Sequence, residues 1–275
     1  MKITVGSILF NTASLLPKGM LEDWLNCIYD IGDEIILVHG ATQAKNHYWD
    51  GDAQWATTNG KSTDDTVEIC RSFPDPQKKI QNIERDGFWD GKTQMCNVWA
   101  QKMTGDYIWQ IDSDEFYLKK DVVKIKELLN KRNPNAVHFY DHHFWGNVNH
   151  IINKETEYLW PNTIPWKRIF KHDRGSLWLS HEPPEYLLSD GSLCNENNVI
   201  SRIETDCLGI RMFHYSCISR AQAEFKTKFY RRNMYLEMWD KWQSDHSIPL
   251  INGTKTEPFV GEQPIDIEKY SGKLW

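Results

Sequence analysis

Apolar and polar residues follow two different periods in the first 140 positions of the chain. Ile3 to Phe10 and Glu34 to Val38 are nearly continuous apolar runs, which are typical of strands buried on both faces of a sheet. Between these runs, positions 21, 24, 25, 28 and 31 are apolar, and this spacing places them on one face of a helix. The chain therefore begins with a predicted strand, helix and strand.

The same alternation continues to residue 140. We expect helices over 63–70, 93–103 and 121–129, and strands over 79–83, 107–111 and 136–140. Ser62 or Thr63 is expected to cap the helix over 63–70. Alternating strands and helices predict an α/β fold, with a mostly parallel central sheet flanked by helices on both faces.

Three further segments depart from this alternation. Residues 41–62 are polar and aperiodic, and we expect a surface insertion there. Residues 141–217 read as short strands and loops. A long helix is expected over 220–242, and the last 30 residues are expected to wrap the surface. We interpret 1–140, 141–217 and 218–275 as three parts of one continuous domain.

Charge and cysteine content narrow the function classes. The 275 residues carry a formal net charge of −6, which argues against a general nucleic-acid binder. The six Cys form no C-x-x-C pair, which favours reduced thiols and a cytoplasmic location. The start MKITVGSILFN does not resemble a signal peptide, and no run approaches the ~20 apolar residues of a membrane span. Peripheral membrane contact stays open.

An acidic cluster follows the predicted strand over 107–111. Asp112, Asp114 and Glu115 come at its carboxyl end, where sheets of this kind bind ligands. Two carboxylates in a D-x-D pattern suit Mg²⁺ or Mn²⁺, completed by substrate phosphates. Acids are also common in surface turns, so on these residues alone both interpretations stay open. A calcium loop is excluded, because Phe116 and Tyr117 stand where an acid or Asn and a Gly are needed.

Several ordered segments resemble family 2 glycosyltransferases of the GT-A fold, and the D-S-D-E variant resembles the lipopolysaccharide-core glucosyltransferase-like branch. Thr63 to Ile69 is similar to the family's S-T-D-G-T-V-E region. Later segments are similar to its G-K…A-x-G-D-Y-I, R-L-F-R…H-E and H-x-S-Y…K…Y patterns. The remaining matching positions are Phe10-Asn11, Gly91-Lys92, Gly105 to Ile108, Lys167 to Phe170, His181-Glu182, His214 to Ser216, Phe225, Lys226 and Tyr230. The resemblance covers roughly residues 3–235. The chain departs from it after the second strand, where Val38-His39-Gly40 replaces an Asp pair, and in the segment 41–62, which lacks a counterpart.

The resemblance implies an inverting, metal-dependent transferase that uses Mn²⁺ or Mg²⁺. It would move a sugar from a nucleoside-diphosphate donor, with UDP among the candidate carriers, to a hydroxyl of a glycan or glycolipid. Residues 1–140 would then hold the donor, and residues 141–217 would hold the acceptor and the catalytic base. A divalent cation would stabilise the leaving diphosphate.

The resemblance and this chemistry assign roles to particular residues. Asp114 is the principal expected metal ligand, with Asp112 and His214 as further ligands. Expected contacts to the donor come from Asn11, Asp65, Lys92, Asp112 and Ser113. Glu182 is the expected general base, with Glu185 as the first alternative and Glu115 as a weaker one.

Each of these assignments competes with a structural interpretation. His214 would equally suit an aromatic core, Glu182 a surface turn, and Lys92 a solvated first turn of a helix. The tryptophans are mainly expected in the core, although one or two of Trp145, Trp160, Trp166 and Trp178 could stack on a sugar ring. Arg168, Lys226 and Arg231 are second-rank candidates for phosphate contacts.

Two other functions stay open on the sequence. One is a Trp-rich carbohydrate-binding protein without catalysis, in which the acids would bind a metal only structurally. The other is a sugar-nucleotide nucleotidyltransferase, which would need a glycine-rich loop with Arg after the first strand. Phe10 to Gly19 contains no such loop.

Overall fold

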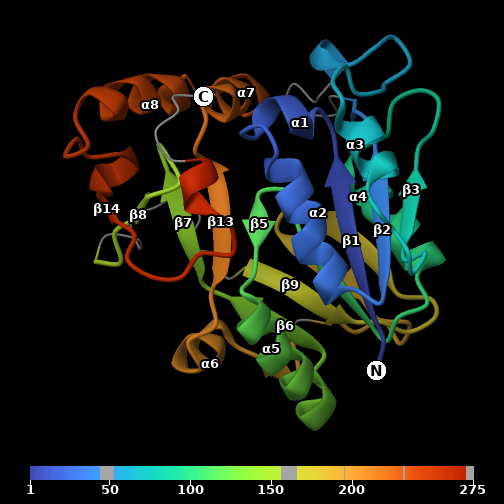
Figure 1. Ribbon diagram of the computed structural model, residues 1–275. Coiled ribbons are helices and arrows are strands. Elements are labelled where there is room, and N and C mark those ends of the chain that lie inside the picture. The colour runs from blue at the N-terminus through green and yellow to red at the C-terminus, as the bar shows by residue number, and fades with distance from the viewer. Residues whose placement is uncertain (44–52, 156–165, 195, 232, 271–275) are drawn as a thin grey trace.

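The computed structural model describes residues 1–43, 53–155, 166–194, 196–231 and 233–270. Two sheets form the frame of the molecule, and helices cover them (Figure 1). The mixed α/β fold expected from the sequence is thus confirmed.

The first sheet is mostly parallel. Its strands, in spatial order, are β12 (Val199–Ile200), β6 (Ala136–Phe139), β9 (Trp166–Lys171), β4 (Tyr107–Gln110), β1 (Ile3–Leu9), β2 (Glu34–His39) and β3 (Ile80–Ile83). β1 pairs in parallel with β2 and β4, and β2 pairs in parallel with β3. β9 runs antiparallel to both β4 and β6. All the strands expected in the first 140 residues are present, within about two residues of their expected ends.

Alternate side chains of the first sheet enter two separate cores. In β2, Ile35 and Leu37 join one buried cluster, whereas Ile36 and Val38 join the other. The first cluster is covered by α2 (Met20–Ile31) and α5 (Lys119–Arg132), and α3 (Thr66–Ser72) contributes Cys70. The second is covered by α4 (Lys92–Lys102) and the hairpin of β10 (Leu177–His181) with β11 (Pro184–Leu187). Helices therefore pack on both faces of the sheet, as the alternation predicts.

The close approach of α4 to the first sheet depends on one glycine. A Cβ atom on Gly6 of β1 would lie 2.6 Å from Cδ2 of Trp99, which is fully buried. The expected helix face of Met95, Cys96, Trp99 and Met103 is buried as predicted. Gly6 thus makes room for the largest side chain on this face.

The second sheet carries the later part of the chain. Its strands, in spatial order, are β14 (Thr256–Pro258), β8 (His150–Ile152), β7 (Asp141–Trp145), β13 (Met212–Cys217) and β5 (Glu115–Phe116). The helix α6 (Arg202–Cys207) lies between β12 and β13 in the chain and packs on β6. Short helical turns occur at α1 (Thr12–Leu15) and, as 3₁₀ turns, at Ala53–Trp55, Ile251–Gly253 and Ile267–Lys269.

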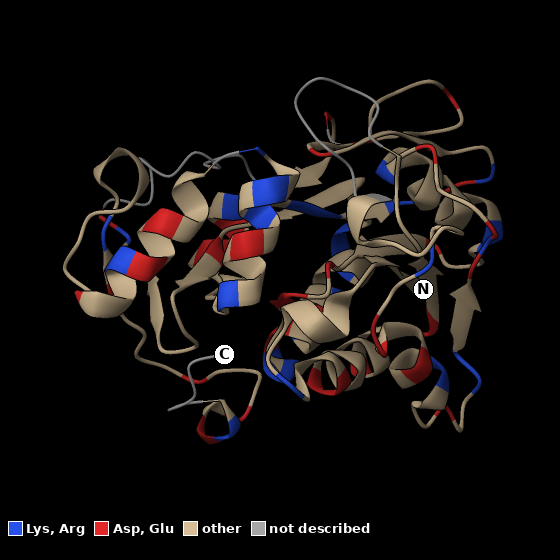
Figure 2. Ribbon diagram, turned by 90° about the horizontal axis from the view of Figure 1, so that it is seen from above, with Lys and Arg blue, Asp and Glu red and all other residues tan. Residues whose placement is uncertain are grey.

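The expected long helix over 220–242 is wrong, because the structure has two helices there. α7 (Arg220–Phe229) ends before Arg231, which has a positive φ of 52°, and α8 (Met234–Ser244) follows. The two helices pack against each other, and both carry acidic and basic residues (Figure 2). Arg220 at the start of α7 forms an ion pair with Asp240 of α8. A hairpin of two helices keeps the same apolar stripe as one long helix, so the sequence period does not reveal the break.

Two other boundaries differ from expectation. α3 begins at Thr66, so neither Ser62 nor Thr63 is its N-cap; instead, the Asp64 carboxylate accepts a hydrogen bond from the Thr66 amide at 3.1 Å. The tail is more than a surface wrapping, because β14 adds an edge strand to the second sheet. Near the end of the described chain, Tyr270 donates a hydrogen bond to Asp23 of α2 at 2.6 Å.

Most tryptophans belong to the cores. Trp145 and Trp178, which were candidates for stacking on a sugar, are 0% and 1% exposed, so the structure excludes them from that role. Trp166 is partly exposed, and Trp160 lies outside the described residues. None of the helices within the described ranges is long and apolar enough to span a bilayer.

Candidate active site

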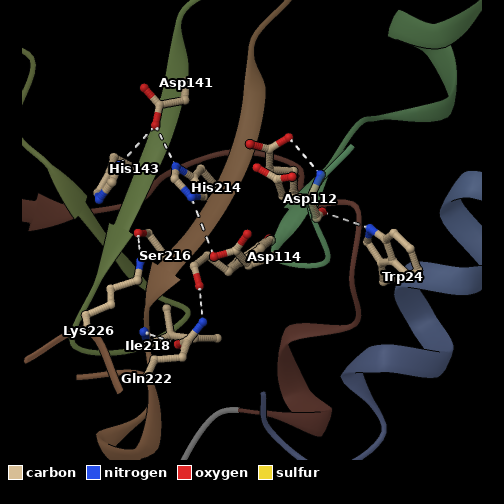
Figure 3. A network of polar contacts seen from close by, with 12 residues as sticks. Trp24, Asp112, Asp114, Asp141, His143, His214, Ser216, Ile218, Gln222 and Lys226 are labelled. Carbon is tan, nitrogen blue, oxygen red and sulfur yellow. Dashed lines mark hydrogen bonds and ion pairs between the residues drawn. The ribbon is translucent and has the colours of Figure 1, made fainter. Parts of the chain in front are cut away.

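The D-S-D turn lies where the chain passes from the first sheet to the second. β4 ends at Gln110, and β5 begins at Glu115 on the edge of the other sheet. Backbone hydrogen bonds fix the turn on both sides, from Ile111 to Gly6 at 3.1 Å and from Tyr215 to Asp114 at 2.8 Å. The Trp24 indole also donates to the Asp112 carbonyl at 3.0 Å (Figure 3). The acidic cluster is therefore held rigidly at the junction of two sheets.

His214 of β13 faces Asp114 across this junction. Its Nε2 lies 3.6 Å from Asp114 Oδ2, and both side chains are mostly buried. On the opposite edge of the ring, Nδ1 donates to Asp141 Oδ2 at 3.3 Å (Figure 3). The same oxygen accepts a second hydrogen bond from His143 Nδ1 at 3.0 Å. The structure thus brings together the expected ligands Asp114 and His214, with two residues that the sequence analysis did not single out.

The charges of this group are strongly coupled. Burial alone would lower the pKa of His214, but Asp114 and Asp141 outweigh it and raise that pKa to about 9. Burial would likewise raise the pKa of Asp114, and His214 instead holds it well below its ordinary value. Because metal ligands must be deprotonated, a cation that binds His214 Nε2 and Asp114 must displace a proton.

Asp112 points toward a different set of partners. Its Oδ2 lies 3.3 Å from Arg168 Nη2, and its Oδ1 lies 3.9 Å from His181 Nε2. Burial would raise the pKa of Asp112, but Arg168 and His181 lower it overall. Asp112 is therefore an anion with two cationic or polar neighbours, and it lies beside the Asp114–His214 pair.

Glu115 is engaged inside the protein. Its carboxylate accepts hydrogen bonds from Arg168 Nε at 2.8 and 3.1 Å and from Arg168 Nη2, and it also accepts from the Asp112 amide at 3.2 Å. Its side chain is 0% exposed. Glu115 therefore supports the turn and does not reach an acceptor hydroxyl, which removes it as a general base.

Glu182 lies at the edge of the same region. It follows His181, the last residue of β10, and its side chain is exposed. Burial raises the pKa of Tyr230, and the charges of Glu182, Asp114 and Asp112 raise it further. These three carboxylates come from distant parts of the chain, and all of them act electrostatically on one tyrosine. Glu185, the alternative base, lies within β11.

Two lysines also lie near the acids. Burial is the main cause of the low pKa of His181, and the charge of Lys92, at the start of α4, lowers that pKa further. The Nζ atom of Lys92 lies 5.1 Å from the centre of the Phe229 ring. Lys226 of α7 donates to the Ser216 hydroxyl and adds to the lowering of the Asp114 pKa, after His214 (Figure 3). Positive charge thus approaches the site from both halves of the chain.

The remaining residues expected to contact the donor are Asn11, Asp65 and Ser113. Asn11 holds the segment after residue 52, because its Oδ1 accepts from the Thr63 amide at 2.8 Å and its Nδ2 donates to the Trp55 carbonyl at 3.1 Å. Asp65 is exposed at the start of α3, and Ser113 is partly exposed within the D-S-D turn. Both polar atoms of the Asn11 side chain are therefore used in holding this segment, whereas Ser113 lies between the two aspartates in the chain.

The sequence contains a signal for Asp141 and His143, the two residues that accompany His214. Asp141 and His143 are two residues apart in the region 141–217, where short strands and loops are expected, and in a strand two such side chains point to the same face. The strand β7 pairs in parallel with β13 and places His143 beside His214. An Asp and a His on one strand face are a sufficient reason to search for a third ligand-forming residue.

Sequence comparison agrees with the resemblance noted above. The sequence model of glycosyl transferase family 2 matches residues 52–183, which is just under half of the chain. The match includes Asp112, Asp114 and Glu182, and it ends before His214. A search of curated proteins finds no match.

Solved structures give broad similarities at low identity. Staphylococcus aureus TarS, residues 1–349, in complex with UDP has 12% identity and a TM-score of 0.46, over 88% of this chain and 72% of that one. The same protein with UDP-GlcNAc has 14% identity and a TM-score of 0.40, over 62% and 45%. The mannosyltransferase PcManGT from Pyrobaculum calidifontis, in complex with GDP-Man and Mn²⁺, has 19% identity and a TM-score of 0.37, over 51% and 35%.

The extent of these similarities is limited. A further structure of TarS residues 1–349, with 13% identity and a TM-score of 0.40, matches over 62% of this chain and 47% of that one, so the matched region spans about half of the solved chain. The family match and the observed sheet nevertheless agree with the fold class expected from the sequence. Residues 52–183 carry the sequence pattern of glycosyl transferase family 2, in a chain with a mixed α/β fold.

Proposed function

We propose that this protein is an inverting, metal-dependent glycosyltransferase. It would move a sugar from a nucleoside-diphosphate donor to a hydroxyl of a glycan or glycolipid. The observation that carries this proposal is the approach of Asp114 Oδ2 to His214 Nε2, 3.6 Å apart, at the carboxyl end of a central strand. The match to family 2 glycosyltransferases over residues 52–183 supports it.

The Asp114–His214 pair has the chemistry of a divalent-cation site. With metal–ligand bonds of ~2.1 Å, two adjacent ligand atoms of an octahedral ion lie roughly 3 Å apart, so a small adjustment of the 3.6 Å separation suffices. A carboxylate combined with an imidazole favours Mn²⁺ over Mg²⁺, because Mg²⁺ prefers oxygen ligands alone. A cation held there would neutralise charge on the leaving diphosphate.

Nearby residues supply the remaining roles. Asp112 is held by Arg168, and we assign it to the donor ribose or to a third ligand position, with Ser113 beside it. Lys92 and Lys226 are placed to attract the diphosphate oxygens.

Proton transfer is assigned to Glu182. Its exposed carboxylate takes the proton of the acceptor hydroxyl as that hydroxyl attacks the anomeric carbon. Because Glu182 acts as a base and no covalent nucleophile is assigned, the reaction inverts the anomeric configuration. Asp65 and Asn11 complete the donor side, Asn11 by holding the segment that precedes α3.

The setting of the reaction is part of the same proposal. The motifs that resemble the lipopolysaccharide-core branch point to a glycan or glycolipid acceptor. That acceptor would allow peripheral contact with a membrane. Six cysteines without a disulfide fit a cytoplasmic location.

The metal-dependent part is tested by binding of UDP and of GDP, each with and without Mn²⁺, at pH 8. We expect tight binding only with Mn²⁺ for the wild type, and loss of that dependence in Asp114→Ala. Asp86→Ala is the matched control, since Asp86 is highly exposed and pairs only with Lys61 among the described ion pairs. Glycan binding without nucleotide affinity would contradict the proposal and favour a carbohydrate-binding protein.

The base is tested by Glu182→Gln. We expect sugar transfer to fall about 10²–10⁴-fold, with UDP affinity unchanged, because the variant removes proton transfer but leaves the donor site intact. Glu185→Gln is the matched control and should stay close to wild type. Normal transfer by Glu182→Gln together with a loss in Glu185→Gln would move the base to Glu185.

A further inference from the structure

One carboxylate oxygen holds two histidine rings behind the candidate metal site. Asp141 Oδ2 accepts hydrogen bonds from His143 Nδ1 at 3.0 Å and from His214 Nδ1 at 3.3 Å. All three side chains are mostly buried, with exposed fractions of 17% for Asp141 and 9% for each histidine. Figure 3 shows Asp141 and Asp114 on opposite sides of the His214 ring.

The neighbouring rings confine His214 in the remaining directions. The His143 ring meets it edge to face, with centroids 4.8 Å apart. The Trp166 ring meets it edge to face at 4.9 Å. A ring packed in this way has little freedom to tilt. The hydrogen bond from Nδ1 to Asp141 then fixes which edge of the ring faces Asp114.

That hydrogen bond also decides which nitrogen can bind a cation. A carboxylate is an acceptor only, so the proton must sit on Nδ1 of His214 when Asp141 binds it. The lone pair of Nε2 is then the one available toward Asp114 once the ring is neutral. Carboxylates that hold histidine ligands in this manner fix both the tautomer and the ring orientation.

We propose that Asp141 is a positioning residue, which aims His214 Nε2 at Asp114 and is itself held in place by His143. The inference rests on the proposed function, in which Asp114 and His214 bind the cation. It assigns a role to Asp141 and His143, neither of which would touch the donor or the acceptor.

Direct binding of a cation by Asp141, His143 and His214 is the competing interpretation. The ligand atoms of Asp141, His143 and His214 all lie within 4.8 Å of one another, so they could bind a cation directly. The two hydrogen bonds at 3.0 and 3.3 Å favour the positioning role, because both Nδ1 protons are already satisfied by the carboxylate. Direct binding is an outcome that the experiment below distinguishes.

The first measurement is Mn²⁺ binding in the presence of UDP, followed by electron paramagnetic resonance. We expect Asp141→Ala to weaken Mn²⁺ binding about 10–100-fold, the usual effect of removing such a partner. His143→Asn retains a donor for Asp141 and should lose less. The matched control is Asp206→Asn, which breaks an ion pair with Arg211 near the same sheet but does not contact His214.

The second measurement needs no metal. Long-range ¹H–¹⁵N spectra of the histidine rings at high pH report which nitrogen of His214 carries the proton. We expect Nδ1 in the wild type and in Asp206→Asn, because Asp141 lies closer to Nδ1 (3.3 Å) than Asp114 lies to Nε2 (3.6 Å), and a shift toward Nε2 in Asp141→Ala. Thermal unfolding of each variant checks that the fold is retained.

These two readouts separate the inference from the proposed function. If the wild type binds no Mn²⁺ with UDP, the metal-dependent function fails, and the ring spectra alone judge the role of Asp141. Unchanged Mn²⁺ affinity in Asp141→Ala, or an unchanged tautomer, would overturn the positioning role. Mn²⁺ binding that survives in Asp114→Ala and disappears in both Asp141→Ala and His143→Asn would overturn it in favour of direct ligation.

Discussion

The ion pair between Arg168 and Glu115 should make the D-S-D turn sensitive to a single substitution. The side chains are 3% and 0% exposed, and the guanidinium binds both carboxylate oxygens of Glu115 and one of Asp112. Arg168→Met removes the cation but keeps much of the apolar volume of the side chain. The carboxylate of Glu115 would then be left buried without its partner.

Removing one partner of a buried pair typically costs about 3–5 kcal/mol. For a chain of this size, 1 kcal/mol corresponds to roughly 2–4 °C in Tm, so we expect a decrease of roughly 6–20 °C. Urea unfolding at pH 8, followed by circular dichroism, measures the free energy directly. The double variant Arg168→Met/Glu115→Leu removes both charges, and we expect it to recover most of the loss.

The pH dependence supplies a second test of the same reasoning. Burial, opposed by Arg168, raises the pKa of Glu115 to about 7 from an ordinary value of 4.5. Without Arg168 this pKa rises further, so the folded protein binds a proton that the unfolded chain releases above pH 4.5. Stability from this group is then greatest at low pH and is lost as the pH rises.

We therefore expect the cost of Arg168→Met to be smaller at pH 5 than at pH 8. Two results would refute the account. One is a cost below about 1 kcal/mol at pH 8, well short of the value for a buried pair. The other is a double variant whose loss equals the sum of the two single losses.

Three further predictions concern packing, a buried histidine and a lysine. Gly6→Ala should cost about 1–3 kcal/mol in unfolding free energy, because its Cβ would lie 2.6 Å from the Trp99 ring, and much less in a Trp99→Leu background. Burial lowers the pKa of His138 to about 4, so below pH 6.5 a proton binds the unfolded chain more readily than the folded one, and roughly 2–3 kcal/mol of unfolding free energy is lost as the pH falls toward 4. In His138→Gln the urea midpoint should therefore change less with pH over that range. Lys226→Met should weaken UDP binding with Mn²⁺ about 10–100-fold, as expected for loss of a charge-assisted hydrogen bond, whereas Lys228→Met on the exposed face of α7 should not.

The first sheet could be read from the sequence because its strands are apolar and regularly spaced. β1, β2 and β4 are almost entirely buried, so each appears as a continuous apolar run. β9 could not be placed in this way. Its sequence WKRIFK has partly exposed positions, and its antiparallel pairing between β4 and β6 arises from contacts far apart in the chain.

The candidate site was predictable to a similar degree. Asp112, Asp114 and His214 were identified from motifs, and the structure brings Asp114 and His214 within 3.6 Å. Asp141 and His143 belong to the same hydrogen-bonded group, but their partner His214 follows about 70 residues later in the chain. Sequence periodicity reports which side chains share a face of one strand, and it is silent about which strands become neighbours.

The position of β9 has a consequence for synthesis of the protein. β6 joins the first sheet only through β9, so the edge of β4 stays unpaired until residue 171 has left the ribosome. At 5–20 residues per second, the ribosome needs roughly 3–12 s to proceed from β4 to the end of β9. An unpaired apolar strand edge is a template for aggregation, so chaperone binding during this interval should strongly affect the yield of folded protein.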